Sequence, residues 1–440
     1  MAYAEKVFKV RDGKKTKQFT WRACYKKPDG SKGTQPGFPT KKTAEDWGTA
    51  QEAAIKAGRW IDPELQRATF GEFARKFMKA RVKRARTMDT RWRNLEQFIL
   101  PKWENVPLLS ITWFDVDSWQ QTLQCDDTKA GHCVSLMSTI MTAAVDAKHL
   151  ATNPLFGRRR TKATGTAVPR KAKTLTTEQK WAPPETVITL AQRLGPATGI
   201  MVLTTAFTGL RWGEAAGLHR DNVLCARRQA HDGGYFECPV IKVVPDVGEL
   251  SEVELRDEDG NKLGTVLRLE HPKSAKGVRD IDVPPFLEQL LRYHLQDWPH
   301  EYVFSTVTGK FWRRGNWGKV IRPAADGRPE RESRQGVAHR AAWEPIMPGL
   351  DMRALRHTHD TYQDQIGVRD ALAYEQAGHE RPGIKAVYQH PTATMRQERL
   401  DGLEEIYRRA MRNLGLKTLW DRVDLLKSPQ TINEDQELAA

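Results

Sequence analysis

The spacing of apolar and polar residues divides the chain into sheet-like and helical regions. Between residues 5 and 60, short strand-like segments separated by glycine turns precede an alanine-rich helix, which predicts a small sheet backed by one helix. Between 67 and 157, apolar residues recur at helical spacing, and Thr112 and Asp115 suit the start of one helix. This second region is predicted to be a helical bundle.

The region from 174 to 400 is mostly helical, with strand-like segments between 240 and 283. Within those segments, residues 246–259 hold seven acidic residues and one arginine, so we expect an outer insertion that a polyanion would repel. A short apolar stripe follows, which can dock on its own domain or on a neighbouring molecule. The stripe comprises Leu403, Ile406, Ala410 and Leu414. The whole pattern predicts a multidomain protein that is mainly α-helical with small β-sheets.

Charge and composition narrow the choice of partners. The 440 residues include 70 lysines and arginines against 55 acids, a formal charge of +15, which favours a polyanion. No run approaches the roughly 20 apolar residues of a membrane span, so nucleic acid is the leading candidate and no membrane is expected. The first residues lack the apolar segment of a signal peptide, which predicts a cytoplasmic location. Five scattered cysteines without a C-x-x-C pair indicate neither a disulfide framework nor a zinc ribbon.

Positive charge concentrates in two places. Residues 5–60 carry 14 basic and 6 acidic residues on strands with Trp21 and Tyr25; such a sheet suits a DNA groove, and the alternative is a solvated basic surface. Residues 158–173 carry seven positive charges and no negative one, which indicates either a linker along a phosphate backbone or a flexible solvated connector. The candidate DNA-binding residues of this linker are Arg158, Arg159, Arg160, Lys162, Arg170, Lys171 and Lys173.

Two segments carry charged side chains at suggestive spacings. Arg211 and Glu214 stand three residues apart at the start of a predicted helix, although such a pair usually lies on the surface and contributes little energy. Lys273 and Lys276 lie in a predicted turn between two strands. A lysine at such a hairpin tip either reaches into a groove or is simply solvated, and both alternatives stay open.

A third segment is a helix with two different faces. One face presents Arg353 and Arg356, whose guanidinium forks match phosphate oxygens, together with His357 and Asp360. The other face is apolar enough to pack against a core and comprises Leu355, His359, Tyr362 and Ile366. Farther along, His379 and Tyr388 stand nine residues apart. From its own surroundings, Tyr388 is either a partly buried core tyrosine or a nucleophile.

In this order the segments resemble the tyrosine recombinase and phage integrase family, over residues 206 to 390. The positions that match the family's boxes are Arg211, Lys273, Arg356, His379 and Tyr388. Where the family usually has a histidine, three residues before the second arginine, this chain has Arg353, which cannot accept a proton near neutral pH. Lys276 is the alternative to Lys273 if the register of the hairpin shifts.

The resemblance implies a site-specific DNA recombinase that acts through a 3′-phosphotyrosyl intermediate. Tyr388 would be the nucleophile, Arg211 and Arg356 would hold the phosphate, and Lys273 would protonate the departing 5′-oxygen. His379 and Arg353 would add hydrogen bonds to the phosphate, while Glu214 would hold the arginine region in place. No metal and no cofactor are expected.

The resemblance also implies an organisation. The expected parts are an arm-type DNA-binding domain (1–63), a helical core-binding, SAM-like domain (64–160), a basic linker (161–173), a mixed α+β catalytic domain (174–400) and a tail (401–440) that is exchanged between neighbours. Expected partners are double-stranded attachment-site DNA, further copies of the chain in a tetramer, and a directionality factor or DNA-bending protein. The expected setting is the nucleoid of a bacterial host, where a phage or another mobile element is integrated or excised.

Two other functions stay open at this point. A DNA-binding regulator that retains the fold without catalysis would bind DNA and never cleave it. A metal-dependent phosphodiesterase would use a cluster of histidines and an aspartate, although two of the histidines would point to different faces of one helix. Its candidate ligands are His357, His359, Asp360, His379 and His390.

Overall fold

The structure is a computed structural model that describes residues 2–11, 14–58, 60, 62–63, 67–80, 84–158, 181–258, 260–380 and 389–421. The chain separates into two compact units, Met1–Thr174 with Glu258–Gly260, and the remaining residues. Helices dominate and the sheets are small and antiparallel, which confirms the predicted fold class. Among the described residues, no helix combines the length and the apolar character needed to cross a membrane.

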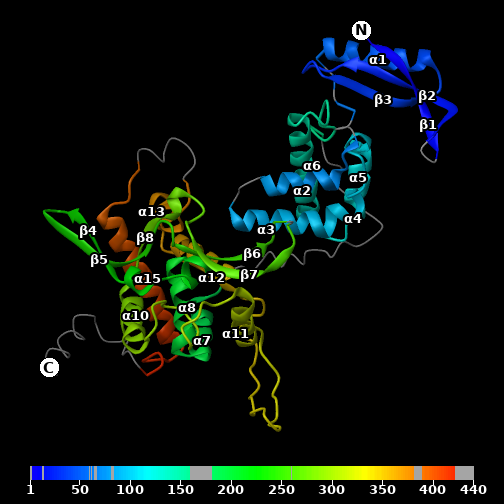
Figure 1. Ribbon diagram of the computed structural model, residues 1–440. Helices are drawn as coiled ribbons and strands as arrows, with labels where there is room; N and C mark the ends of the chain where they lie inside the picture. The colour runs from blue at the N-terminus through cyan, green and yellow to red at the C-terminus, as the bar shows by residue number, and fades with distance from the viewer. Residues whose placement is uncertain are drawn as a thin grey trace. The chain divides into compact units, whose positions relative to one another are not determined.

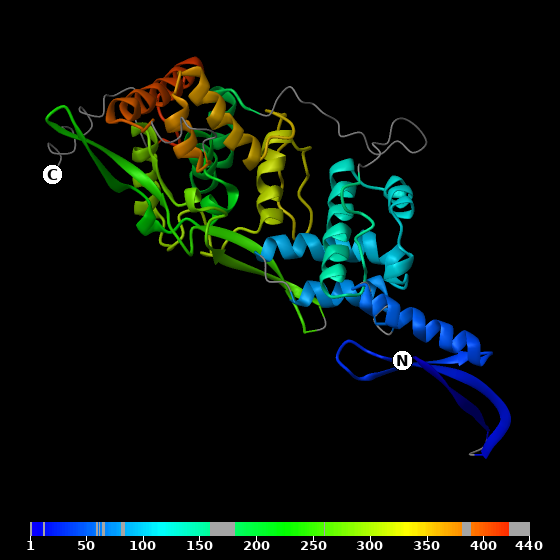
Figure 2. The ribbon, with the colours of Figure 1, turned by 90° about the horizontal axis from the view of Figure 1, so that it is seen from above.

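The first unit begins with a three-stranded antiparallel sheet in the order β1-β2-β3. Helix α1 covers one face, and the ring of Tyr25 on β2 lies 5.7 Å from that of Trp47 on α1. Figure 2 shows β1 and β2 continuing past the helix as a two-stranded ribbon. The elements are β1 (Tyr3–Arg11), β2 (Lys14–Lys26), β3 (Lys32–Phe38) and α1 (Lys41–Lys56). The predicted sheet with one helix is confirmed.

A helical bundle completes this unit, as predicted. Thr112 caps its α5 by accepting a hydrogen bond from the backbone N–H of Asp115. A π-helical turn joins α3 to α4 just before Pro101, which lacks the N–H that a regular helix would use there. The elements are α2 (Phe70–Ala80), α3 (Ala85–Asn94), the π-helical turn (Leu95–Ile99), α4 (Leu100–Trp103), α5 (Trp113–Thr122) and α6 (Asp127–Asp146).

The second unit is built around the buried helix α8. Its residues from Gly199 to Thr208 are all buried, because the helix is apolar on every side. Helices α7, α10 and α12 pack against it, and α15 packs on those three in turn (Figure 1). The helices are α7 (Pro184–Leu194), α8 (Pro196–Thr208), α9 (Trp212–Ala216), α10 (Pro285–Asp297), α11 (Arg314–Asp326), α12 (Met352–Gln365), α13 (Asp370–Ala377) and α15 (Ala393–Asn413).

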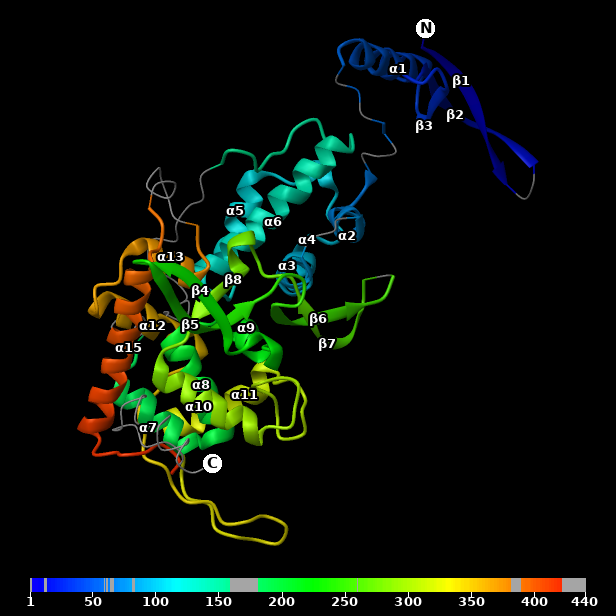
Figure 3. The same ribbon diagram turned by 90° about the vertical axis from the view of Figure 1, so that its left-hand side faces the viewer.

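Two antiparallel sheets flank these helices (Figure 3). The first has the order β4-β5-β8 and comprises β4 (Cys225–His231), β5 (Gly234–Val243) and β8 (Arg279–Asp282). The second pairs β6 (Glu249–Arg256) with β7 (Lys262–Glu270), so the acidic stretch forms a separate insertion between β5 and β8. The predicted hairpin carrying the two lysines is wrong, because β7 pairs with β6 and not with β8. Those lysines lie in a connection between sheets, beside the 3-10 turn Ala275–Gly277.

The apolar stripe near the end of the chain docks on its own domain. Leu403, Ile406 and Ala410 are buried in the core of the second unit, and Leu414 packs at its edge. The expected boundary between residues 400 and 401 falls inside α15, so the whole helix belongs to the second unit. The correction has a physical reason, since the stripe finds enough apolar surface in cis. Residues 422–440 lie outside the described part of the chain.

Candidate functional site

Arg211 stands at the start of α9 and is tied to Glu214. Its backbone N–H and its guanidinium each donate a 2.8 Å hydrogen bond to the Glu214 carboxylate, and the guanidinium also reaches the carbonyl of Ala377 at 3.1 Å. Glu214 is buried, so this pair is not the surface ion pair that its spacing usually makes. Burial alone would raise the pKa of Glu214, but the hydrogen bonds and charges of Arg279 and Arg211 outweigh it and lower that pKa to about 2.

The insertion supports α9 from the side. A Cβ atom on Gly213 would lie 2.7 Å from the carbonyl oxygen of Leu250, and one on Gly217 would lie 2.9 Å from the Leu269 side chain. These distances leave no room for a larger residue, so β6 and β7 pack directly on the helix that begins after Arg211.

Arg356 approaches the same point from α12. Its guanidinium donates to the carbonyl of Gly209 and, at 2.8 Å, to that of Ala377. The carbonyl of Ala377 therefore receives both guanidiniums. Burial, and then the charge of Arg211, lower the pKa of Arg356 to about 10, which still leaves it charged at neutral pH. On the other face of α12, Leu355 and Tyr362 are buried as predicted.

His379 follows α13 and completes the cluster. Its Nε2 lies 3.4 Å from the Arg356 guanidinium, and because a guanidinium can only donate, Nε2 accepts and the ring proton lies on Nδ1. Partial burial, and then the charges of Arg356 and Arg211, lower the pKa of His379 below its usual 6.5. The imidazole is therefore neutral at pH 7 and is able to accept a proton.

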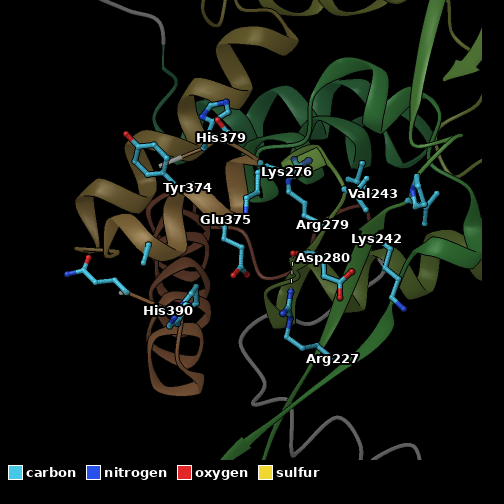
Figure 4. Close-up of a pocket in the computed structure, with 18 residues that line it drawn as sticks. Arg227, Lys242, Val243, Lys276, Arg279, Asp280, Tyr374, Glu375, His379 and His390 are labelled. Carbon is cyan, nitrogen blue, oxygen red and sulfur yellow. Dashed lines mark hydrogen bonds between the residues drawn. The ribbon is translucent and has the colours of Figure 1, made fainter. Parts of the chain in front are cut away.

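A pocket of about 830 Å³ opens beside His379 (Figure 4). Lys276 lines it, and so do the three residues that follow Tyr388 in the sequence, 389–391. Lys273 is exposed and is not among the lining residues. Arg353 is also exposed and forms no hydrogen bond or ion pair with other described residues.

Several predicted residues cannot be placed. Tyr388 lies outside the described residues, and so do Arg159, Arg160, Lys162, Arg170, Lys171 and Lys173, which leaves Arg158 as the last described and exposed residue before that gap.

The metal-site alternative gains nothing from the geometry. His359 is fully buried, which lowers its pKa, whereas His357 and Asp360 are half exposed. In the part of the chain that the structure describes, no group of three or more histidines, cysteines and acids is placed to hold a metal ion.

Sequence reasoning missed Arg279, at the start of β8. Its guanidinium donates two hydrogen bonds to Glu214, at 2.9 and 3.0 Å, and one to the carbonyl of Gln376 at 2.7 Å. The available signal was the charge pattern, since Arg279 and Asp282 are charged residues in a short strand that proved to be buried. Their partners lie far away in the sequence, so no local spacing pointed to them.

A second arginine–carboxylate cluster forms at the other end of β8. Asp282 is fully buried and pairs with Arg227 at 2.6 Å, with Arg396 at 3.0 Å and with Arg399. Arg396 also pairs with Glu375 at 2.7 Å. The cluster joins α15 to the sheet and to α13.

The chain is similar to several integrases. It is 25% identical over 380 residues to the protein named as the prophage phiRv2 integrase of Mycobacterium tuberculosis, covering 84% of this chain and 88% of that one. It is 22% identical over 368 residues to the integrase of Mycobacterium phage L5, covering 80% and 85% of the two chains. No protein-family model matches it. Both relatives are named integrases, so the chain resembles the tyrosine recombinase and phage integrase family over most of its length.

Two solved recombinase structures resemble this one. The Tn1549 transposon integrase in complex with transposon right end DNA gives a TM-score of 0.48 at 15% identity, covering 79% of this chain and 100% of that one. A lambda integrase tetramer bound to a Holliday junction gives a TM-score of 0.44 at 14% identity, covering 82% and 95%.

Proposed function

We propose that this recombinase cleaves and rejoins DNA at specific sites through a covalent bond between Tyr388 and a 3′-phosphate. The observation that carries the proposal is the convergence of Arg211, Arg356 and His379 around the carbonyl of Ala377. Two guanidiniums and an imidazole, brought together from three distant segments, suit a phosphate whose negative charge shifts during the reaction.

The proposed step is balanced without a cofactor. The phenol oxygen of Tyr388 attacks phosphorus and gives up its proton, the bond from phosphorus to the 5′-oxygen breaks, and that oxygen takes a proton. Attack by another strand's 5′-hydroxyl reverses these changes, so the phosphodiester is conserved and DNA is rejoined without ATP. Arg211 and Arg356 would bind the non-bridging oxygens, and Arg353, which is exposed and stands three residues before Arg356, would add a further donor.

Proton transfer would use His379 and the lysine turn, which is the connection between β7 and β8 that carries Lys273 and Lys276. We assign the leaving-group proton to Lys276 in preference to Lys273, because Lys276 lines the pocket that His379 shares. The neutral imidazole of His379 offers the proton acceptor that Arg353 cannot be. Glu214 orients Arg211.

The other parts of the chain would bind and assemble. The N-terminal sheet would contact arm-type DNA, the helical bundle and the basic linker would hold the core site, and four chains would join two duplexes. Exchange between neighbours would involve the chain after residue 421, because the stripe before it docks in cis. The protein would act in the cytoplasm, at the host nucleoid, with a directionality factor or a DNA-bending protein.

The test traps the covalent intermediate. Nicked duplexes tiled across the DNA that flanks the coding sequence are incubated with the protein, and adducts are separated on a denaturing gel. We expect an adduct with the wild type and with Tyr235→Phe, a control at the exposed tip of β4 and β5, but none with Tyr388→Phe. No wild-type adduct on any duplex that the protein binds specifically would support the inactive regulator, and an adduct with Tyr388→Phe would refute the assigned nucleophile.

A further inference from the structure

Arg279 contacts three separate segments of the site without being one of the recognised boxes. It is 8% exposed, and each of its three guanidinium nitrogens donates at least one hydrogen bond. Both oxygens of Glu214 accept from it, so that carboxylate is held between Arg279 on one side and Arg211 on the other. The forked geometry fixes the plane of the carboxylate and with it the direction of Arg211.

The same side chain also fastens the lysine turn. Its Nη1 donates a 2.9 Å hydrogen bond to the carbonyl of Gly277, the residue after Lys276. Its Nε donates to the carbonyl of Gln376, which precedes the Ala377 carbonyl shared by the two other arginines. One guanidinium thus joins the lysine turn, the Arg211 box and the segment that leads to His379.

Gly378 shows how tightly these segments meet. It has a φ of +64°, and a Cβ atom there would lie 3.0 Å from both the Arg279 guanidinium and the carbonyl oxygen of Lys276. Gly378 therefore packs against two groups at once, the backbone of the lysine turn and the guanidinium of Arg279. Because that turn belongs to no hairpin, strand pairing does not hold it in place.

We infer that Arg279 is a positioning residue, which acts by fastening the Lys276 turn to the Glu214–Arg211 pair and to the segment before His379. This inference rests on the proposed function. It goes beyond it by naming the residue that replaces hairpin pairing as the support of the lysine. A purely structural buried ion pair would instead stabilise the domain without any particular effect on proton delivery.

The test separates these roles by changing the leaving group. Arg279→Lys keeps the positive charge but removes the forked set of guanidinium N–H donors. Arg292→Lys makes the same change in an exposed ion pair on α10 and serves as the control. Each protein is assayed for adduct formation at saturating DNA on two nicked substrates, one with the normal 5′-oxygen and one with sulfur in its place. Sulfur is a good leaving group without a proton, so it removes the need for the lysine.

We expect Arg279→Lys to form adduct at least about tenfold more slowly than wild type on the oxygen substrate, with the gap closing to within about threefold on the sulfur substrate. Lys276→Ala should show the same pattern, with Lys273→Ala as its comparison, while Arg292→Lys should match wild type on both substrates. DNA binding, measured by gel mobility, should change less than threefold.

Three results would overturn the inference. The first is a wild-type rate for Arg279→Lys on the oxygen substrate. The second is an equal loss of rate on both substrates, which would place the effect of Arg279 on folding or on the phosphate clamp alone. The third is recovery of the rate by the sulfur substrate for Lys273→Ala and not for Lys276→Ala. That result would show that Lys273, and not Lys276, delivers the proton. A wild type that forms no adduct at all is a different outcome, because it contradicts the proposed function.

Discussion

Glu214 and Asp282 are both buried carboxylates neutralised by arginines, yet they are used differently. Glu214 is held by Arg279, whose side chain is 4% exposed, and by Arg211, which is 29% exposed and lies at the site. Asp282 is held by three arginines that are 17%, 5% and 0% exposed. The Glu214 cluster keeps a guanidinium edge available for a ligand, and we call it the open cluster. The Asp282 cluster buries almost all of its charge, and we call it the closed cluster. An arginine–carboxylate cluster thus becomes a candidate site through its exposed edge, and not through its composition.

The largest expected effect comes from breaking the closed cluster. Asp282→Asn removes the carboxylate that three arginines share, and we expect the free energy of unfolding to fall by about 3–5 kcal/mol, because the remaining charges are buried without compensation. Urea denaturation followed by tryptophan fluorescence measures this loss. Asp280→Asn, on the same strand and partly exposed, should lose less than about 1 kcal/mol. Equal losses in the two variants would mean that the Asp282 cluster contributes no more to the free energy of unfolding than an ordinary carboxylate on the same strand.

A substitution in the open cluster should change the rate of adduct formation more than the stability of the protein. Arg211→Ala should slow adduct formation about 100- to 1000-fold, equivalent to about 3–4 kcal/mol in the barrier, because one donor to the developing charge is lost. Its melting temperature should fall less than that of Arg399→Ala, whose guanidinium is wholly buried. Rates from single-turnover gels and melting by circular dichroism give the two measurements. The comparison fails if Arg211→Ala is the more unstable and the more active of the two.

Acid should weaken the open cluster within a defined range. The pKa of Glu214 in the folded protein, about 2, lies below its ordinary 4.5, so its contribution is complete above pH 4.5 and disappears as the pH falls towards 2. The shift corresponds to about 3 kcal/mol. The stability difference between wild type and Glu214→Gln, measured by urea denaturation, should therefore shrink over that range. A difference that stays constant from pH 4.5 to 2 would contradict the lowered pKa, and Glu288→Gln, in an ion pair with the exposed Arg292, serves as the control.

The smallest effect is expected where the closed cluster meets the pocket. Glu375 pairs with Arg396 and lines the pocket, but its side chain is 34% exposed, so solvent screens the pair. Glu375→Gln should lower the free energy of unfolding by about 1 kcal/mol, as measured by urea denaturation. A loss as large as that of Asp282→Asn would show that the cluster does not end at Asp282.

The sequence predicted local structure better than long-range pairing. Capping of α5 by Thr112, the buried face with Leu355, and the separate acidic insertion follow from local patterns, and all are confirmed. The hairpin for Lys273 was wrong, because period-2 alternation marks strands without naming their partners. Arg279 was missed for a related reason, since its role depends on Glu214, 65 residues away, and on the backbone carbonyl of Gln376, 97 residues away.

The close packing of β6 and β7 on α9 has an evolutionary consequence. Gly213 and Gly217 leave no space for a side chain because the insertion occupies it. Within the lineage of this chain, the insertion and these two positions should therefore change together. Relatives that carry the insertion should keep very small residues at both positions, and relatives that have lost it should be free to fill them, which makes a two-residue signature for the presence of the hairpin in any newly sequenced member.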